Sequence, residues 1–202
     1  MTLVEVPSLL RADDGTVIPL DVRAWSEAAD AAEHRVLDRA RGPVLDIGCG
    51  PGRLVIALAE RGIPALGVDA SSAAVDQALG RQATALVRSV FDPIPGTGRW
   101  ATALLFDGNV GIGGDPVRLL ARVHQLLARD GRALVETTSP TSTTRSFPVR
   151  IERGDHRSPW FPWAQVAAGD IEALARRAGF GRVEGFQEGD RWFAQLERGA
   201  PR

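Results

Sequence analysis

The stretch LDIGCGPGRL, residues 45–54, places Gly48, Gly50 and Gly52 at every second position, directly after an apolar run and directly before a helical pattern. Glycine has no Cβ atom, so the backbone at these positions adopts positive φ angles at little cost and lets a ligand approach closely. The helix that follows offers unpaired backbone N–H groups to an anion. The stretch therefore predicts a ligand-binding turn between a buried strand and a helix.

The size, composition and charge of the chain indicate one globular domain. It has 202 residues, of which 44% are hydrophobic, and a formal net charge of −1, which fits a single domain with its own core. Positive charges are scattered, so no basic face for nucleic acid is evident, and no apolar run approaches the roughly 20 residues of a membrane span. We expect a cytoplasmic protein, a monomer or a homodimer, without nucleic-acid or membrane partners. Its arginine-rich, lysine-free composition is typical of a GC-rich bacterial genome.

The few reactive side chains limit the chemistry. Cys49 is the single cysteine, which excludes an internal disulfide and a zinc site built on several thiolates. Lysine and tyrosine are absent, so Schiff-base chemistry and a phenolic base are excluded. His34 and His124 fall on predicted helices without a cluster of metal-binding partners. We therefore expect no metal.

Strand and helix patterns alternate along the chain. Strands are expected at 43–47, 65–68, 83–87, 101–106, 132–137, 183–187 and 192–196, and helices at 24–39, 52–61, 71–79, 116–128 and 170–178. The alternation predicts an α/β fold with a doubly wound, seven-stranded, mostly parallel sheet and an antiparallel C-terminal hairpin. We divide the single domain, 1–202, into a cap and helix at 1–41, a cofactor-binding core at 42–137, a substrate-side loop or lid at 138–168, and a closing helix and hairpin at 169–197.

The residues around the glycine turn indicate the ligand. The spacing is G-x-G-x-G behind Asp46, whereas a dinucleotide site has G-x-G-x-x-G and aims its helix at a pyrophosphate that a carboxylate would repel. A ligand with an ammonium group for Asp46 and a carboxylate for the helix is an amino acid, such as the methionyl part of S-adenosylmethionine. Asp69 ends the second strand, where its two oxygens match the vicinal diol of a ribose. Phe91 and Asp92 follow the third strand, where they would meet the adenine ring and its amino group.

The motifs VLDIGCGPG (44–52), GVDAS (67–71), LARDGRALVE (127–136) and LARRAGF (174–180), with Asp92, carry a family resemblance. From about residue 40 to 197 the chain resembles the class I S-adenosylmethionine-dependent methyltransferases. The resemblance implies a Rossmann-like methyltransferase fold, S-adenosylmethionine as cofactor and S-adenosylhomocysteine as product. The cofactor-binding residues that we expect are Asp46, Gly48, Cys49, Gly50, Gly52, Asp69, Ala70, Ser71, Phe91, Asp92 and Asp107.

Simpler structural roles compete with these assignments, and the family pattern has one gap. The glycines fit a tight turn, Asp69 fits a helix N-cap, and Asp92 before a proline fits an ordinary turn. Cys49 lies between glycines, which favours a structural role over a nucleophilic one. The fourth strand is followed by Asp107-Gly108-Asn109 instead of Asn/Asp-Pro-Pro-aromatic. This departure speaks against methylation of DNA bases or protein glutamine.

The substrate side is expected at the ends of the fourth and fifth strands and in the long segment 138–168. Loops beyond about 12–15 residues are commonly lids or binding loops. In this segment Trp160 and Trp163 are stiffened by neighbouring prolines, which predicts a rigid apolar wall. The alternative is a segment that only packs as a cover on the sheet. The substrate residues that we expect are Asn109, Glu136, Arg153, Trp160 and Trp163.

The reaction implied by the resemblance is an in-line attack of a nucleophile on a sulfonium methyl group. The electrophile is already activated, so the protein contributes alignment and, for a weakly acidic nucleophile, a base. Asp107, Glu136 and His156 are the candidate bases, and we name His156 and Asp107 as catalytic because histidine has an intrinsic pKa near 6.5 and Asp107 follows the fourth strand directly. Our hypothesis is methyl transfer to a small-molecule acceptor. Two alternatives stay open: a silent protein that binds the cofactor or a partner, and a non-methylating reaction on the same fold.

Overall fold

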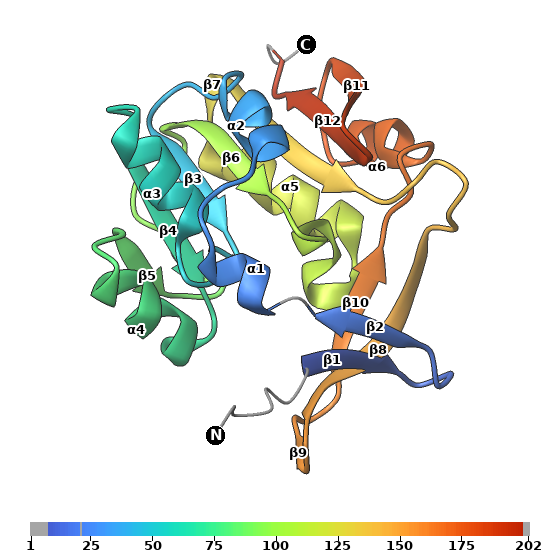
Figure 1. Ribbon diagram of the computed structural model, residues 1–202. Coiled ribbons are helices and arrows are strands. Elements are labelled where there is room, and N and C mark those ends of the chain that lie inside the picture. The colour runs from blue at the N-terminus through green and yellow to red at the C-terminus, as the bar shows by residue number, and fades with distance from the viewer. Residues whose placement is uncertain (1–7, 21, 200–202) are drawn as a thin grey trace.

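A computed structural model describes residues 8–20 and 22–199 of the chain (Figure 1). Its larger sheet has seven strands in the order β11-β12-β7-β6-β3-β4-β5. The strands β3 to β7 pair in parallel, while β12 pairs antiparallel with both β7 and β11. The expected seven-stranded, mostly parallel sheet with an antiparallel C-terminal hairpin is therefore confirmed. Its strands are β3 (Val44–Ile47), β4 (Ala65–Asp69), β5 (Ala85–Val87), β6 (Trp100–Leu105), β7 (Leu127–Thr137), β11 (Val183–Glu188) and β12 (Arg191–Glu197).

Helices pack against both faces of this sheet. On one face α2 and α3 share a buried cluster with alternate strand residues such as Val44 and Leu104, and on the other α5 and α6 share one with Leu45 and Ile47. Because side chains alternate along a strand, Asp46 points to the same face as Val44, toward α3. The helices are α1 (Val22–Ser26), α2 (Ala31–Leu37), α3 (Arg53–Glu60), α4 (Ser72–Gly80), α5 (Pro116–Leu126) and α6 (Ile171–Arg177), and a 3₁₀ segment, η1, spans Asn109–Gly114.

The chain reverses its direction of travel across the sheet beside β3. From β3 it moves outward to β4 and β5, and then returns to place β6 on the opposite side of β3. Ligands of doubly wound sheets bind at such a reversal, outside the carboxyl ends of the strands. The glycine turn that follows β3 and the segment η1 that follows β6 both lie at this point.

The single leading helix expected at 24–39 is wrong, because the chain forms two helices there. Asp30 begins α2 with a reciprocal capping box: the Glu33 N–H donates to Asp30 Oδ1 at 2.7 Å, and the Asp30 N–H donates to Glu33 Oε2 at 3.0 Å. A residue in this capping role has extended backbone, and Asp30 has φ −80° and ψ 175°. The apolar spacing of the segment continues through the break, so periodicity alone did not show it.

The segment 138–168, expected as a loop or lid, mostly forms strands of a second sheet. This sheet has the order β10-β8-β1-β2, with β9 paired to β8, and all of its pairs are antiparallel. The strand that lies between β8 and β2 comes from the first residues of the described chain, and no local pattern reveals a pairing over so long a separation. Figure 1 shows this sheet across one end of the larger sheet. Its strands are β1 (Ser8–Ala12), β2 (Val17–Leu20), β8 (Arg145–Arg153), β9 (His156–Arg157) and β10 (Phe161–Gln165).

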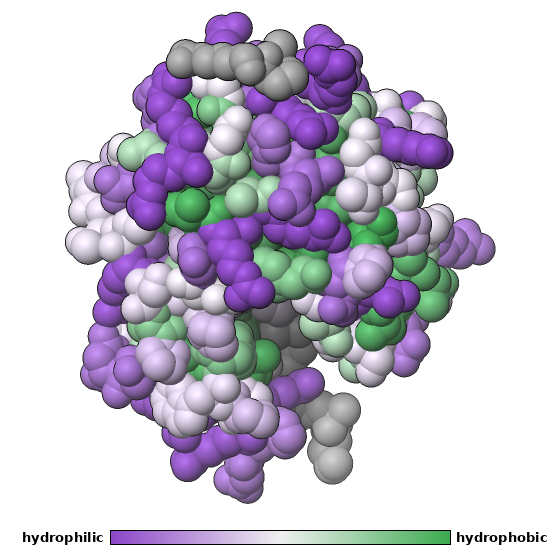
Figure 2. All heavy atoms as spheres, turned by 180° about the vertical axis from the view of Figure 1, so that it is seen from behind, coloured by the Kyte–Doolittle hydropathy of each residue, from purple (hydrophilic) through white to green (hydrophobic). Residues whose placement is uncertain are grey.

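The surface shows no extended apolar face among the described residues. On the side turned away from the view of Figure 1, charged and apolar side chains are interspersed (Figure 2). The exposed large apolar side chains are spread over both sheets, α4 and the segment before β10: Val17, Leu79, Leu86, Val87, Ile151 and Trp160. None of the described helices is long and apolar enough to cross a membrane.

The second sheet is held to the first by close backbone contact between β10 and η1. A Cβ atom added at Gly111 would collide with the carbonyl oxygen of Ala164, and one added at Gly114 would lie 2.8 Å from the Cβ atom of Pro162. Backbone atoms cannot move aside as flexible side chains do. The absence of side chains at these two positions therefore lets the sheets approach.

We expect Gly111→Ala to lower the free energy of unfolding by about 1–3 kcal/mol, the usual cost of overpacking a tight contact. Gly185→Ala is the matched control, because Gly185 lies in β11 with no atom within 4 Å of an added Cβ, and its effect should stay within about 0.5 kcal/mol. Urea unfolding of both variants tests this. Equal stability of the two variants would show that the contact between β10 and η1 is not tight.

Candidate active site

The glycine turn between β3 and α3 is built by all three glycines, but they play different parts. Gly48, Gly50 and Gly52 have φ angles of +73°, +51° and +84°, which residues with a Cβ atom rarely adopt. A Cβ atom at Gly52 would lie 2.8 Å from that of Ala83, so this glycine lets α3 pack closely. The first two glycines shape the turn itself.

Asp69 ties the end of β4 to the glycine turn. Its Oδ2 accepts a hydrogen bond from the Gly50 N–H at 2.9 Å, and its Oδ1 accepts one from the Ser71 N–H at 2.8 Å. Each carboxylate oxygen has two lone pairs, so both oxygens retain the capacity to accept a second bond from a ligand. The helix N-cap that follows is Ser71, whose side chain accepts from the Ala74 N–H. Asp69 is therefore not the cap.

A cavity of about 480 Å³ opens beside this turn, and we call it the glycine-turn cavity. Of the expected cofactor residues, Gly48, Asp69, Ala70, Ser71 and Phe91 line it. The other residues of its wall come from β3, β4, the segment after β5, η1 and the second sheet: Ile47, Val68, Arg88, Ser89, Val90, Asn109, Ile112, Gly113, Ile151, Phe161, Pro162 and Trp163.

The remaining expected cofactor residues lie behind or beside this cavity. Gly50 and Gly52 complete the turn without lining the cavity, and Asp92 is exposed next to Phe91. The Cys49 thiol is buried in a small core cluster with residues of α3 and α4, and burial raises its pKa well above the ordinary value. A thiol that stays protonated is a poor nucleophile, which agrees with the structural role expected for Cys49.

A second cavity, of about 540 Å³, lies between the two sheets, and we call it the inter-sheet cavity. Its walls are mostly apolar and come from the second sheet, α1, η1 and the segment after β10: Leu10, Ile18, Leu20, Trp25, Val110, Phe147, Ile151, Phe161, Trp163, Ala164 and Val166. Its polar or small lining residues are Asp107, Gly108, Asn109, Glu136, Thr137, Thr138 and Gln165. Asn109, Ile151, Phe161 and Trp163 line both cavities. The two cavities therefore lie side by side along a common wall.

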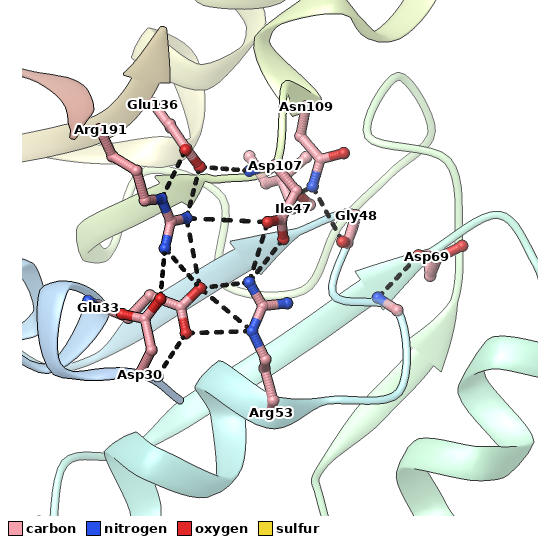
Figure 3. Close-up of polar contacts among 11 residues, drawn as sticks. Asp30, Glu33, Ile47, Gly48, Arg53, Asp69, Asp107, Asn109, Glu136 and Arg191 are labelled. Atoms are coloured by element: carbon pink, nitrogen blue, oxygen red, sulfur yellow. Dashed lines mark hydrogen bonds and ion pairs between the residues drawn. The ribbon is translucent and has the colours of Figure 1, made fainter. Parts of the chain in front are cut away.

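Asn109 fastens η1 to the glycine turn at this common wall. Its Nδ2 donates hydrogen bonds to the carbonyl oxygens of Ile47 at 2.9 Å and Gly48 at 3.0 Å (Figure 3). A Cβ atom at Gly48 would lie 2.5 Å from this nitrogen, so the bonds require glycine at position 48. The position of Asn109 between the cavities therefore depends on the first glycine of the turn.

A cluster of charged side chains lies at the end of the inter-sheet cavity, and Figure 3 shows that it brings together residues of α2, α3, β7 and β12 with Asp107 after β6. Arg53 Nη2 contacts Asp107 Oδ2 at 2.8 Å and also pairs with Glu33. Arg191 contacts Glu136 through Nε and Nη2, both at 2.8 Å. We call the following residues the charge cluster: Asp30, Glu33, Arg53, Asp107, Glu136 and Arg191.

Asp107 and Glu136 are both engaged within this cluster. Glu136 Oε2 also accepts from the Asp107 backbone N–H at 2.7 Å, and Asp107 has a φ angle of +55°. Burial raises the pKa of Asp107 above its ordinary value, although the charge of Arg53 opposes the shift. The contacts with Arg53 and Arg191 fix the orientation of both carboxylates.

Asp46 is a buried carboxylate with one unpartnered oxygen among the described residues. It is 2% exposed, and its Oδ2 makes no hydrogen bond within the described chain. Its pKa is raised to about 7, because burial and the negative charges of Asp107 and Asp69 outweigh the opposing positive charge of Arg53. An unpartnered buried oxygen of this kind is costly, and a cationic ligand group would compensate it.

Three of the expected catalytic and substrate residues are not brought to the site. His156 lies on β9 in an exposed hairpin beside Arg153, and neither residue lines a cavity. Trp160 is 46% exposed, with the guanidinium of Arg150 lying 4.8 Å from its ring centre. The other expected substrate residues, Asn109, Glu136 and Trp163, do line the inter-sheet cavity, as does Asp107.

The sequence interpretation missed the arginines of the charge cluster and much of the apolar wall. Arg53 directly follows the last glycine of the turn, and this position was a signal available in the sequence. Arg191 reaches Glu136 only because β12 pairs with β7, and no sequence motif marks that pairing. Trp25 and Gln165 enter the wall through the arrangement of α1 and β10.

The fold and site define an α/β protein whose ligand cavities lie at the carboxyl ends of β3, β4 and β6. A family model described as a methyltransferase domain matches residues 23–184. The chain belongs to this methyltransferase family, which confirms the resemblance to the class I S-adenosylmethionine-dependent methyltransferases. A search of curated protein sequences found no significant match.

Solved structures share the fold at low sequence identity. An S-adenosylmethionine-dependent methyltransferase from Bacteroides fragilis, in complex with S-adenosylhomocysteine, is 21% identical with a TM-score of 0.79, over 95% of this chain and 87% of that chain. The 1,6-didemethyltoxoflavin-N1-methyltransferase of Burkholderia thailandensis is 21% identical with a TM-score of 0.63, over 90% and 82%. A possible histamine N-methyltransferase from Thermotoga maritima is 16% identical with a TM-score of 0.61, over 83% and 87%.

We expect Asp46→Asn to stabilise the protein at neutral and higher pH. The folded-state pKa of Asp46, about 7, lies above the ordinary value of 3.8, so the native state binds more protons between these values and stability falls as pH rises through this window. The variant should gain roughly 1–4 kcal/mol over the wild type at about pH 8 and less near pH 4. Urea unfolding across this pH range measures the difference, and a difference independent of pH would contradict the assignment.

Proposed function

We propose that this protein binds S-adenosylmethionine in the glycine-turn cavity and transfers its methyl group to a small-molecule acceptor in the inter-sheet cavity, leaving S-adenosylhomocysteine. The observation that carries the proposal is the common wall of the two cavities, made by Asn109, Ile151, Phe161 and Trp163. Because the same residues line both cavities, the cavities adjoin, and ligands bound in the two can lie next to each other. A transfer reaction requires this arrangement, whereas binding of a single ligand does not.

The residues around the glycine-turn cavity fit the chemical groups of the cofactor. Asp69 holds two carboxylate oxygens with spare lone pairs at the cavity wall, which suits a ribose diol. Asp46 lines neither cavity, but it lies in β3 directly before the turn, and its unpartnered buried oxygen suits an ammonium group. Phe91 offers a ring face to the cavity. The S-adenosylhomocysteine bound to the Bacteroides fragilis protein supports the same cofactor. When bound, the cofactor supplies a methyl group on a positively charged sulfur, which is an activated electrophile.

The chain's own contribution is alignment and the exclusion of water. Holding two reactants in the correct geometry is worth roughly 7–11 kcal/mol of barrier in favourable cases. The mostly apolar wall of the inter-sheet cavity provides such confinement, and Asn109 is held at the common wall by its two hydrogen bonds. Asp107 and Glu136 are engaged by arginines, so we assign them to orientation and electrostatics in place of the role of base expected for Asp107.

The size of the inter-sheet cavity supports a small molecule as the acceptor. Its volume of about 540 Å³ lies within the range of roughly 300–1,000 Å³ that is typical of small-molecule sites. The Burkholderia thailandensis neighbour contains bound 1,6-didemethyltoxoflavin, which supports the same class. Formation of S-adenosylhomocysteine from labelled cofactor and a pool of candidate acceptors tests the proposal. Binding without product formation would favour the silent cofactor-binding alternative.

We expect Asp69→Ala to weaken binding of S-adenosylhomocysteine by about 1.5–3 kcal/mol, because two ribose hydroxyl groups and the Gly50 N–H would lose a charged acceptor. Isothermal titration calorimetry measures this change. Asp76→Ala is the control, since Asp76 is an exposed carboxylate on the neighbouring helix α4, and its affinity should match that of the wild type. Equal affinity in a folded Asp69→Ala variant would contradict the diol role.

The two tryptophans of the 138–168 segment are expected to differ sharply. Trp163 lines both cavities, so Trp163→Ala should raise the acceptor KM and also weaken S-adenosylhomocysteine, each by about tenfold or more, the usual scale for losing a large aromatic contact. Trp160 lines neither cavity, and Trp160→Ala should change both constants by less than about twofold. Steady-state kinetics with calorimetry tests the pair. Similar losses in the two variants would place the wall elsewhere.

A further inference from the structure

The inter-sheet cavity carries a specific combination of shape and charge. Four aromatic side chains, Trp25, Phe147, Phe161 and Trp163, contribute to its walls. Phe161 and Trp163 meet edge to face, with ring centres 6.3 Å apart. Aromatic faces and edges of this kind favour a planar aromatic ligand that stacks or packs against them.

The charged groups at the end of this cavity are negative on balance. Asp107 and Glu136 are the only ionisable residues that line it within the described chain. The whole charge cluster, with these two residues included, holds four carboxylates against the two guanidiniums of Arg53 and Arg191. Asp46 adds negative charge when it is ionised. Bound S-adenosylmethionine would add one net positive charge, which is too little to reverse the balance.

The net negative charge at the end of the cavity favours some classes of nucleophile over others. An anionic oxygen or sulfur would enter against repulsion from the carboxylates. A protonated alkylamine would be attracted but stabilised in its cationic, non-nucleophilic form, and no histidine lines the cavity to remove its proton among the described residues. A neutral ring nitrogen has its lone pair available at neutral pH and needs no base.

The wall also carries one unused polar side chain. Gln165 lies on β10, on the same face as Phe161 and Trp163, and its amide makes no side-chain hydrogen bond among the contacts of the described chain. Asn109 directs its Nδ2 toward the glycine turn, which leaves its Oδ1 available. An amide that both donates and accepts suits the polar edge of a heterocycle.

We propose that the acceptor, within the methyl-transfer function on which this inference rests, is a planar nitrogen heteroaromatic that is uncharged at neutral pH and is methylated on a ring nitrogen. The lone pair of that nitrogen forms the new bond to the methyl carbon while the carbon–sulfur bond breaks and its electron pair remains on sulfur. The positive charge thereby moves from sulfur to the heterocycle. The carboxylates of Asp107 and Glu136 stabilise this charge on the side of the acceptor.

The test compares bicyclic aromatics of similar size on the protein saturated with S-adenosylhomocysteine. At about pH 7.5 isoquinoline carries an uncharged ring nitrogen, whereas 2-naphthoate and 2-naphthalenethiolate are anions. We expect isoquinoline to bind at least about tenfold more tightly than 2-naphthoate in calorimetry. Labelled S-adenosylmethionine should yield N-methylisoquinolinium. Preference for either anion, or no binding of isoquinoline, overturns the inference.

Two changes of charge at the cavity wall should shift the preference for isoquinoline over 2-naphthoate in opposite directions. Gln165→Glu adds a carboxylate to the wall and should give a preference for isoquinoline over 2-naphthoate about threefold or more wider than that of Gln165→Met, which has similar length, is uncharged and equally lacks the amide. Glu136→Gln removes a carboxylate and should narrow the preference. If Glu136→Gln does not fold, the comparison of Gln165→Glu with Gln165→Met tests the inference alone. An equal preference for isoquinoline in these two variants counts against the inference.

The results that would contradict the proposed function differ from those that would contradict the proposed acceptor class. Failure of the wild type to bind S-adenosylhomocysteine would overturn the methyl-transfer proposal, and the same probes would then be titrated into the unloaded protein, where their order of affinity still decides the ligand class. Selective binding of isoquinoline without methyl transfer would likewise count against the function and support the ligand class.

Discussion

The ion pairs of Arg53 connect the parts of the molecule on which the site depends. Arg53 is the first residue of α3, only 8% of its side chain is exposed, and it bonds to Glu33 of α2 and to Asp107 after β6. Removing one member of a buried ion pair commonly costs about 3–5 kcal/mol because the partner is left charged and unpaired. The positions of α2, the glycine turn and the end of β6 are therefore linked through one guanidinium.

The guanidiniums of Arg53 and Arg191 hold the two carboxylates at the cavity in fixed positions, which suits them to an electrostatic role. Asp107 contacts Arg53, and Glu136 is held by two bonds from Arg191. Carboxylates fixed in this way keep a constant orientation and need no reorganisation when charge moves nearby. Burial raises the pKa of Asp46 and of Asp107. Neighbouring carboxylates add to this rise, because several negative groups share only two positive partners.

Local chemistry allowed the larger sheet and the glycine turn to be predicted from the sequence. The alternation of apolar strands with capped helices indicated all seven strands, and Asp69 was expected at the end of β4, where it lies. The second sheet was not predictable from local pattern, because β1 pairs with β8 across most of the chain. His156 was chosen for its intrinsic pKa, which carries no information on position, and the β8–β9 hairpin places it in solvent. Arg191 and Gln165 reached the site through strand pairing alone.

Under the proposed function, the two sheets divide the recognition of the two ligands between them. The glycine turn and Asp69 belong to the larger sheet, and most of the apolar wall of the inter-sheet cavity comes from the second sheet. Substitutions in β1, β2 and β8 that keep the sheet folded therefore change the inter-sheet cavity and leave most of the glycine-turn cavity unaltered. Ile151, Phe161 and Trp163 are exceptions, because they line both cavities. A family that keeps one cofactor while changing acceptors can vary the amino-acid sequence of its second sheet. The glycine turn, which Asn109 and Asp69 hold in place, tolerates little variation of its sequence.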